Sequence, residues 1–120
     1  FMSTKKIGNM GEEQAAAYLR ANGYQIKAAQ FRSPMGEIDL VAEKDHTLVF
    51  VEVKTRHPTC YGTPAQAVSY TKRRRIVQTA YWYIQQKHLP EGLCRFDVIE
   101  VYCHGNGKAR IQHFENAFEV

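Results

Sequence analysis

Cysteine is scarce in this chain of 120 residues. The three cysteines, Cys60, Cys94 and Cys103, are odd in number and lack the Cys-x-x-Cys or Cys/His spacing of zinc sites. This pattern argues against a disulfide framework and against a structural zinc site. It favours free thiols in a reducing compartment, so we expect a cytoplasmic protein.

Long apolar runs are also missing. No run approaches the roughly 18–20 residues of a membrane-spanning helix. Residues 3–10 are polar and lack the apolar segment of a signal peptide. Phe1 precedes Met2, and we expect it to be an added residue outside the fold. With no internal repeat or linker in view, we predict one domain over residues 8–118, a flexible segment 1–7 and no membrane association.

The overall composition is that of an ordinary globular protein. Hydrophobic residues make up 44% and charged residues 23% of the chain, which is long enough for one core. The net charge is +4 and the isoelectric point is about 9.0. This mildly basic balance is compatible with a nucleic-acid partner without requiring one.

The most informative stretch, residues 36–54, is typical of two strands joined by a tight turn. Residues 48–53 are apolar apart from Glu52, and residues 44–47 supply the turn. If Asp45 and His46 form a two-residue loop, Asp39 lies opposite Glu52. A three-residue loop would shift the pairing by one position and separate these two acids.

The same register places Glu37 opposite Lys54 and puts Lys54 on the face of Glu52, two residues further along. Directly opposed side chains lie roughly 4.5–5.5 Å apart, and like charges there destabilise the pair. Asp39 and Glu52 would therefore share a proton or a cation, and a hard divalent ion suits carboxylate oxygens. Two acids and a lysine at the end of a hairpin indicate a metal-dependent phosphodiester site.

The rest of the chain adds two helices and three strands. We predict a first helix over 10–22 and a second from Thr63 (N-cap) and Pro64 (N1) to about Lys87, either straight or bent near 69–71. The order is α-β-β-β-α-β-β, an α/β fold with a central mixed sheet flanked by helices. The further predicted strands cover 24–31, 94–103 and 109–114, and the predicted loops cover 32–36 and 54–64.

Glu12 is a candidate on the first helix. It shares a face with Ala16 and Leu19, whereas Glu13 points towards solvent. The alternative is an acid in the first helical turn that the helix dipole favours.

The second helix carries a buried stripe and a basic run. The run 72–75 (Lys-Arg-Arg-Arg) straddles the stripe, and neighbours on a helix point about 100° apart, so these four residues cannot all serve one ligand. A solvated face is the alternative. The stripe comprises Val68, Ile76, Ala80 and Ile84, with Val77 and Tyr81 beside it.

Several motifs together resemble a known family. An acid at Asp39 followed by Glu52-Val53-Lys54 resembles the PD-(D/E)xK nuclease signature, with Ile38 where that signature has proline. The wider set looks like the YraN-like family of small bacterial proteins, similar to archaeal Holliday-junction resolvases, over about residues 8–118. The motifs are Gly11-Glu12, 36–40 (GEIDL), 50–56 (FVEVKTR), Tyr61-Gly62, Lys72 and 95–98 (RFDV).

The resemblance implies a restriction-endonuclease-like core and specific roles. Asp39 and Glu52 match the two signature acids, and Lys54 matches the lysine. Glu12 matches a first-helix glutamate that reaches the metal, and Gln66 matches a second-helix glutamine. The implied cofactor is Mg²⁺ or Mn²⁺, and the implied partner is DNA, structured or branched, cut by a homodimer. Candidate phosphate contacts are Lys72, Arg73, Arg75, Arg56, Arg32 and His57.

Three hypotheses follow. The first is a metal-dependent DNA endonuclease, and the second is a non-cleaving nucleic-acid-binding module of the same fold that acts with a partner protein. The third is a purely structural ion network, which is disfavoured because one lysine would face two acids between apolar strands.

Overall fold

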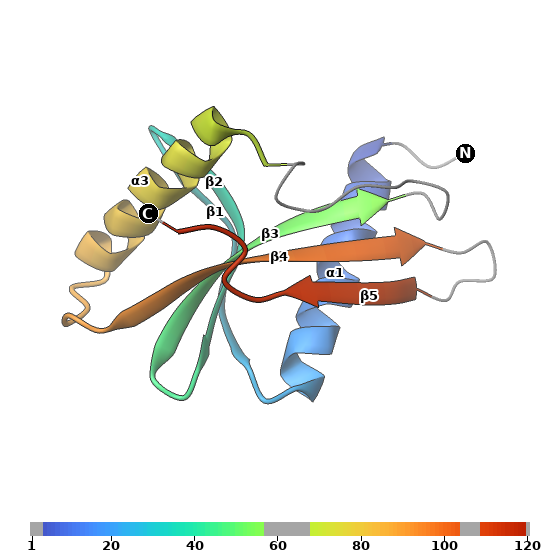
Figure 1. The fold of residues 1–120 in the computed structure, drawn as a ribbon, viewed down its shortest axis with the longest axis horizontal. Helices are drawn as coiled ribbons and strands as arrows, with labels where there is room; N and C mark the ends of the chain where they lie inside the picture. Colours follow the sequence, from blue (N-terminus) through green and yellow to red (C-terminus); the bar gives the residue numbers. More distant parts are fainter. Residues whose placement is uncertain (1–3, 57–67, 104–108, 120) are drawn as a thin grey trace.

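The computed structural model describes residues 4–56, 68–103 and 109–119 (Figure 1). The described elements follow the predicted order of one helix, three strands, one helix and two strands. They are α1 (Thr4–Ala21), β1 (Gln25–Ser33), β2 (Gly36–Lys44), β3 (Thr47–Arg56), α3 (Tyr70–Gln86), β4 (Leu93–Cys103) and β5 (Ala109–Phe114).

The five strands form one mixed sheet in the order β1-β2-β3-β4-β5. Only β3 and β4 pair in parallel, and the chain between them includes α3, since parallel neighbours need a crossover. α1 lies behind the sheet and α3 in front of it (Figure 1). The predicted α/β fold with a central mixed sheet between helices is therefore confirmed. No helix among the described residues is long and apolar enough to cross a membrane.

Each face of the sheet has its own core. Val49 and Val51 of β3 face α1 and pack with Leu19, whereas Phe50 faces α3 and packs with Ile76. This alternation follows from the period of two along a strand. Each fully buried large apolar side chain contributes roughly 1.5–3 kcal/mol, and these two layers hold both helices against the sheet.

The central hairpin has the predicted register. Asp45 and His46 form its two-residue turn with φ values of 51° and 60°, the positive values that the type I′ turn requires. Regular pairing of β2 with β3 runs from Lys44–Thr47 to Leu40–Val51. Asp39 and Glu52 lie one position beyond this last pair.

The hairpin of β1 and β2 bends next to Asp39. Leu40 packs on the α1 side of the sheet, whereas Ile38, two residues earlier, packs on the α3 side. Strict alternation would place both on one face. Opposite this point, Gln30 of β1 has a φ of 50°, which ordinary strand residues avoid. The bend therefore redirects both strands at Gln30 and Asp39.

Two predicted boundaries near the N-terminus are wrong. α1 begins at Thr4 rather than at Met10, so part of the segment that was predicted to be flexible is helical. The loop predicted over 32–36 is a two-residue turn, because Ser33 pairs with Gly36. The hydroxyl of Ser33 accepts hydrogen bonds from the N–H groups of Met35 and Gly36, which satisfies the turn locally.

Helix α3 begins at Tyr70, within the range 69–71 where the prediction left a bend open. Ser69 is extended (φ −64°, ψ 159°), and its hydroxyl accepts a hydrogen bond from the N–H of Lys72, so Ser69 caps α3. A helix continuous through Ser69 is therefore wrong, while Thr63 and Pro64 lie outside the described residues. Ile76 and Ala80 are buried as predicted.

Tyr81, predicted beside the buried stripe, is 57% exposed. Tyr83 is buried in its place, with its ring edge-on to Phe31 and Phe50. The stripe is thus centred on Ile76, Thr79, Ala80 and Tyr83.

Candidate functional site

Two acids meet where the hairpin bends. Asp39 Oδ2 accepts a hydrogen bond from the backbone N–H of Val53 at 2.8 Å, so the side chain of β2 reaches the backbone of β3 beyond the last regular pair. Glu52 precedes Val53 on β3 and is only 7% exposed. Its side chain points to the α3 side, like that of Phe50 two residues earlier. The structure thus brings the two predicted acids to one place.

Two lysines neutralise Glu52. Lys72 Nζ lies 2.7 Å and Lys54 Nζ 3.6 Å from the same atom, Glu52 Oε1. Lys54 follows Glu52 by two residues on the same face of β3. Lys72 lies one helical turn before the buried Ile76, so its side chain starts on the side of α3 that faces the sheet. The predicted grouping of Asp39, Glu52 and Lys54 therefore gains a fourth member from α3.

The cluster shifts the protonation of its members. Burial and the negative charge of Glu52 raise the pKa of Asp39 to about 7, although the N–H of Val53 opposes this shift. Burial lowers the pKa of Lys54, and the neighbouring Lys72 lowers it further. Burial also disfavours the charged form of Lys72, but its hydrogen bond to Glu52 outweighs burial and raises its pKa. Such opposed shifts in one cluster are typical of functional sites.

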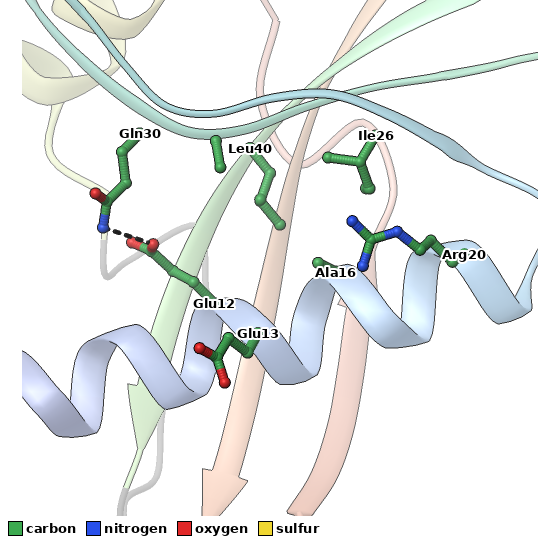
Figure 2. A pocket seen from close by; sticks show the side chains of 8 residues that line it. Glu12, Glu13, Ala16, Arg20, Ile26, Gln30 and Leu40 are labelled. Atoms are coloured by element: carbon green, nitrogen blue, oxygen red, sulfur yellow. Dashed lines mark hydrogen bonds between the residues drawn. The ribbon is translucent and has the colours of Figure 1, made fainter.

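Glu12 approaches the cluster from α1. Its Oε2 accepts a hydrogen bond of 2.9 Å from Gln30 Nε2, at the bend of β1 (Figure 2). The negative charge of Glu12 is a further, smaller cause of the raised pKa of Asp39. Glu12 therefore faces the sheet near the acids, whereas Glu13 is exposed as predicted.

An open groove of about 360 Å³ runs between α1 and β1 beside this contact. Glu12 and Gln30 lie towards one end and Arg20 lies towards the other (Figure 2). Ala16, Ile26, Ala29 and Leu40 also line it. Neither Asp39 nor Glu52 lines this groove, so it reaches the neighbourhood of the acids only through Glu12 and Leu40.

The donor set suits a hard divalent cation. Asp39 and Glu52 offer carboxylate oxygens, and Mg²⁺ is commonly held by one or two carboxylates with water completing its shell. A cation between them would also relieve the repulsion that raises the pKa of Asp39. Within the described part of the chain, no three acid, histidine or cysteine side chains converge on one metal position. Glu12 as a direct ligand is thus a prediction, and Gln30 holds it here.

The other predicted basic residues lie apart from the cluster. Arg32 pairs with Glu37 at 3.4 Å across β1 and β2. Regular pairing of β2 with β3 ends at Leu40–Val51, so the predicted pair of Glu37 and Lys54 is not part of it. Arg56 donates a hydrogen bond of 2.9 Å to Glu100. Arg73 is half-buried and Arg75 is exposed on α3. His57 and Gln66 lie outside the described residues.

Two groups were not found by sequence reasoning. The backbone N–H of Val53 carries no side-chain signal, and Gln30 appears in the sequence as an ordinary strand residue. The distance between Lys72 and Glu52 was also unforeseen, because the run of four cations gives no hint of which one turns inward. The one sequence signal for the direction of Lys72 was its position four residues before Ile76, which puts both on the same face of the helix.

These features define a mixed α/β protein with a partly buried carboxylate–lysine cluster where β2 bends beside β3. The chain belongs to the uncharacterised protein family UPF0102, whose model matches residues 11–101. The match includes Glu12, Asp39, Glu52, Lys54 and Lys72.

Three relatives illustrate the similarity. A UPF0102 protein of Caldicellulosiruptor saccharolyticus is 39% identical over 98% of this chain and 100% of its own length. The UPF0102 protein of Syntrophotalea carbinolica is 43% identical over 95% and 92% of the two chains. That of Symbiobacterium thermophilum is 44% identical over 98% and 99%.

Proposed function

We propose that this protein is a divalent-metal-dependent DNA endonuclease with a restriction-endonuclease-like core of the PD-(D/E)xK type. The observation that carries this proposal is the placement of Asp39 beside Glu52 at the bend, with Lys54 3.6 Å from Glu52 Oε1. Asp39, Glu52 and Lys54 thus lie close together, and two acids beside a lysine can support phosphodiester hydrolysis. The hydrolysis requires an activated water, stabilised phosphate charge and a protonated leaving oxygen.

Asp39 and Glu52 would hold the cation, and the backbone carbonyl of Val53 could supply a further oxygen. Bound Mg²⁺ or Mn²⁺ lowers the pKa of water and neutralises negative charge on the phosphate. The Val53 N–H keeps Asp39 turned towards β3. Glu12 acts from α1 through water.

In this proposal, Lys54 acts on the attacking water. Burial lowers its pKa, so its amine gives up a proton more readily than an exposed lysine would. It is fixed on the central strand, where its ammonium approaches the carboxylate of Glu52. Lys54 can therefore orient the water, accept its proton, or stabilise charge on the phosphate when protonated.

The DNA backbone contacts come from the basic side of α3. The sequence of α3 contains four cations, at positions 72–75, and no acidic residue. Such a helix attracts phosphate without reading bases. Arg32 and Arg56 would add phosphate contacts from β1 and β3 only by exchanging their present partners, Glu37 and Glu100. Cutting a branched substrate on two strands would require two sites, and so a homodimer.

A non-cleaving binding module is the second candidate. The observation that favours it is that two ammonium groups already neutralise Glu52, while no third metal ligand converges within the described residues. In this second candidate function, the same basic surface binds nucleic acid, and a partner protein cleaves it.

Cleavage of labelled single-stranded, duplex, flap and four-way-junction DNA with Mg²⁺ or Mn²⁺ tests the proposal. Asp39→Asn and Lys54→Ala should each lower the rate by at least about a hundredfold. Asp45→Asn and Lys87→Ala are matched controls at exposed positions and should cut as the wild type does.

All five proteins would be purified identically, because a contaminating nuclease survives every substitution. Equal cutting by all five, or none by the wild type, rejects the nuclease. Binding of DNA without cutting would then favour the module.

A further inference from the structure

Two ammonium groups converge on one carboxylate oxygen. Lys72 Nζ and Lys54 Nζ lie 2.7 Å and 3.6 Å from Glu52 Oε1. With Asp39 ionised, the two acids of the cluster are balanced by two lysines. The carboxylate that the proposed function assigns to a metal therefore already has cationic partners supplied by the protein itself.

A divalent cation cannot simply be added to this arrangement. It would place two positive charges beside two ammonium groups in a partly buried site, where repulsion is stronger than in water. At least one ammonium must leave Glu52 when the cation arrives. The lysine that leaves should be the one whose ammonium reaches solvent at the smaller cost in free energy.

Lys72 is the lysine that can move. Its side chain is 43% exposed, against 23% for Lys54. It starts from the first turn of α3, at the rim of the cluster, whereas Lys54 belongs to the central strand β3. Rotation about its side-chain bonds would take the ammonium into solvent without moving the backbone.

We infer that Lys72 is an internal counter-ion that occupies Glu52 in the metal-free protein and gives way to the divalent cation. This inference rests on the proposed metal site. It assigns Lys72 a positioning role distinct from that of a permanent phosphate contact.

The arrangement couples metal binding to substrate binding. A phosphate near the start of α3 would draw the ammonium of Lys72 away from Glu52, and the vacated carboxylate would then bind the cation more tightly. By linkage, the cation would strengthen the hold of Lys72 on the phosphate to the same degree. The metal site would thus be completed mainly when nucleic acid is present.

Titration calorimetry with Mn²⁺ alone, without nucleic acid, tests the inference. The proteins are the wild type, Lys72→Met, Lys72→Arg, Arg74→Met and Asp39→Asn, the last of which removes a proposed metal ligand. At about pH 8.5, Asp39, with its pKa of about 7, is ionised. We expect Lys72→Met to bind Mn²⁺ roughly tenfold more tightly than the wild type, a common size for coupling between two sites.

Lys72→Arg and Arg74→Met distinguish the effect of a cation beside Glu52 from the effect of the net charge of the protein. Lys72→Arg keeps a cation beside Glu52 and should bind Mn²⁺ about as weakly as the wild type. Arg74→Met removes one positive charge from the exposed side of the same helix, where Arg74 lies over the ring of Tyr70. It should leave the affinity within about twofold of the wild type, because exposed charges are screened.

The outcomes are distinguishable. Equal or weaker binding by Lys72→Met, with binding by the wild type that Asp39→Asn abolishes, overturns the inference and leaves the metal site standing. An equal gain in Lys72→Met and Arg74→Met also overturns it, since the effect would be one of net charge. No binding by the wild type or by Lys72→Met rejects the metal-dependent function together with the inference. Binding that appears only in Lys72→Met supports it. Circular dichroism would verify that each variant is folded.

Discussion

The carboxylate of Asp39 lies 2.8 Å from the backbone nitrogen of Val53, where the regular pairing of β2 with β3 has already ended. The side chain thus takes the place of a backbone carbonyl of β2. This substitution joins the bend of the hairpin to the residue between Glu52 and Lys54. The candidate site therefore depends on a local feature of the sheet and does not require a long loop to order it.

The raised pKa of Asp39 predicts a pH-dependent stability. Its pKa of about 7 in the folded protein exceeds the ordinary value of 3.8, so the folded state binds this proton more tightly than the unfolded state does. The resulting stabilisation is complete below about pH 4 and is lost as the pH rises to about 7. Asp39→Asn removes the titration but keeps an oxygen that can accept the hydrogen bond of Val53.

We therefore expect the free energy of unfolding of Asp39→Asn, relative to the wild type, to increase between about pH 4 and pH 7 and then to level off. Urea denaturation across this range, without divalent cations, measures the difference. Asp45→Asn, an exposed acid in the turn, should show no comparable rise. A difference that does not vary with pH for Asp39→Asn would show that its carboxyl is not held in the environment described.

The hairpin could be predicted because its register depends on a local property. Asp45 and His46 form a two-residue turn, and such a turn fixes every pair that follows. The bend at Gln30 and Asp39 could not be predicted, because the rule of alternating faces assumes an unbroken strand. Gln30 has a positive φ, but glutamine is not one of the residue types, such as glycine or asparagine, that signal such a turn in a sequence.

Only the part of the site that lies on the hairpin could be predicted from the sequence. Asp39, Glu52 and Lys54 come from neighbouring strands, so the register of the hairpin predicts that they lie close together, although the acids lie one position beyond the last regular pair. Lys72 comes from a different layer, and its direction depends on how α3 packs on the sheet. The sequence left open whether the helix bends near 69–71, and in the structure Ser69 caps α3, which sets where Lys72 lies on the helix.

A buried ionic network outside the site predicts a large loss of stability. Asp97 is fully buried and accepts hydrogen bonds from Arg95 Nε at 2.8 Å, His113 Nε2 at 2.7 Å and the N–H of Asn116 at 2.9 Å. The bonds from His113, Arg95 and Asn116 outweigh burial and lower the pKa of Asp97. Asp97→Asn should lower the free energy of unfolding at neutral pH by about 3–5 kcal/mol, because it leaves buried donors without their anion.

Chemical denaturation would measure this loss for Asp97→Asn, with Glu115→Gln as the matched control. Glu115 approaches the same Arg95 at 3.8 Å but is 61% exposed, so its removal should cost no more than about 1 kcal/mol. A similar loss in both variants would mean that burial does not distinguish the two ion pairs. The effect of Asp97→Asn should also shrink in acid, as Asp97 itself becomes protonated.

Gly11 and Thr55 set how closely α1 approaches β3. Gly11 is buried, and a Cβ added there would collide with the hydroxyl of Thr55 and lie 3.3 Å from its Cβ. Alanine is intrinsically favoured over glycine in a helix by about 1 kcal/mol. We nevertheless expect Gly11→Ala to destabilise the protein by about 1–3 kcal/mol, since overpacking forces the helix away from the sheet. The neighbouring Glu12 would then be displaced from Gln30.

A double-mutant cycle tests this contact. Thr55→Ala removes the hydroxyl and methyl groups that the new Cβ would meet, so the Gly11→Ala/Thr55→Ala protein should recover most of the loss. The expected coupling is about 1–2 kcal/mol, within the range for residues in contact. Additive effects would mean that Thr55 does not limit the approach of the helix. If Glu12 contributes to metal binding, Mn²⁺ affinity should fall in Gly11→Ala and recover in the double variant, because the helix that carries Glu12 returns to its place.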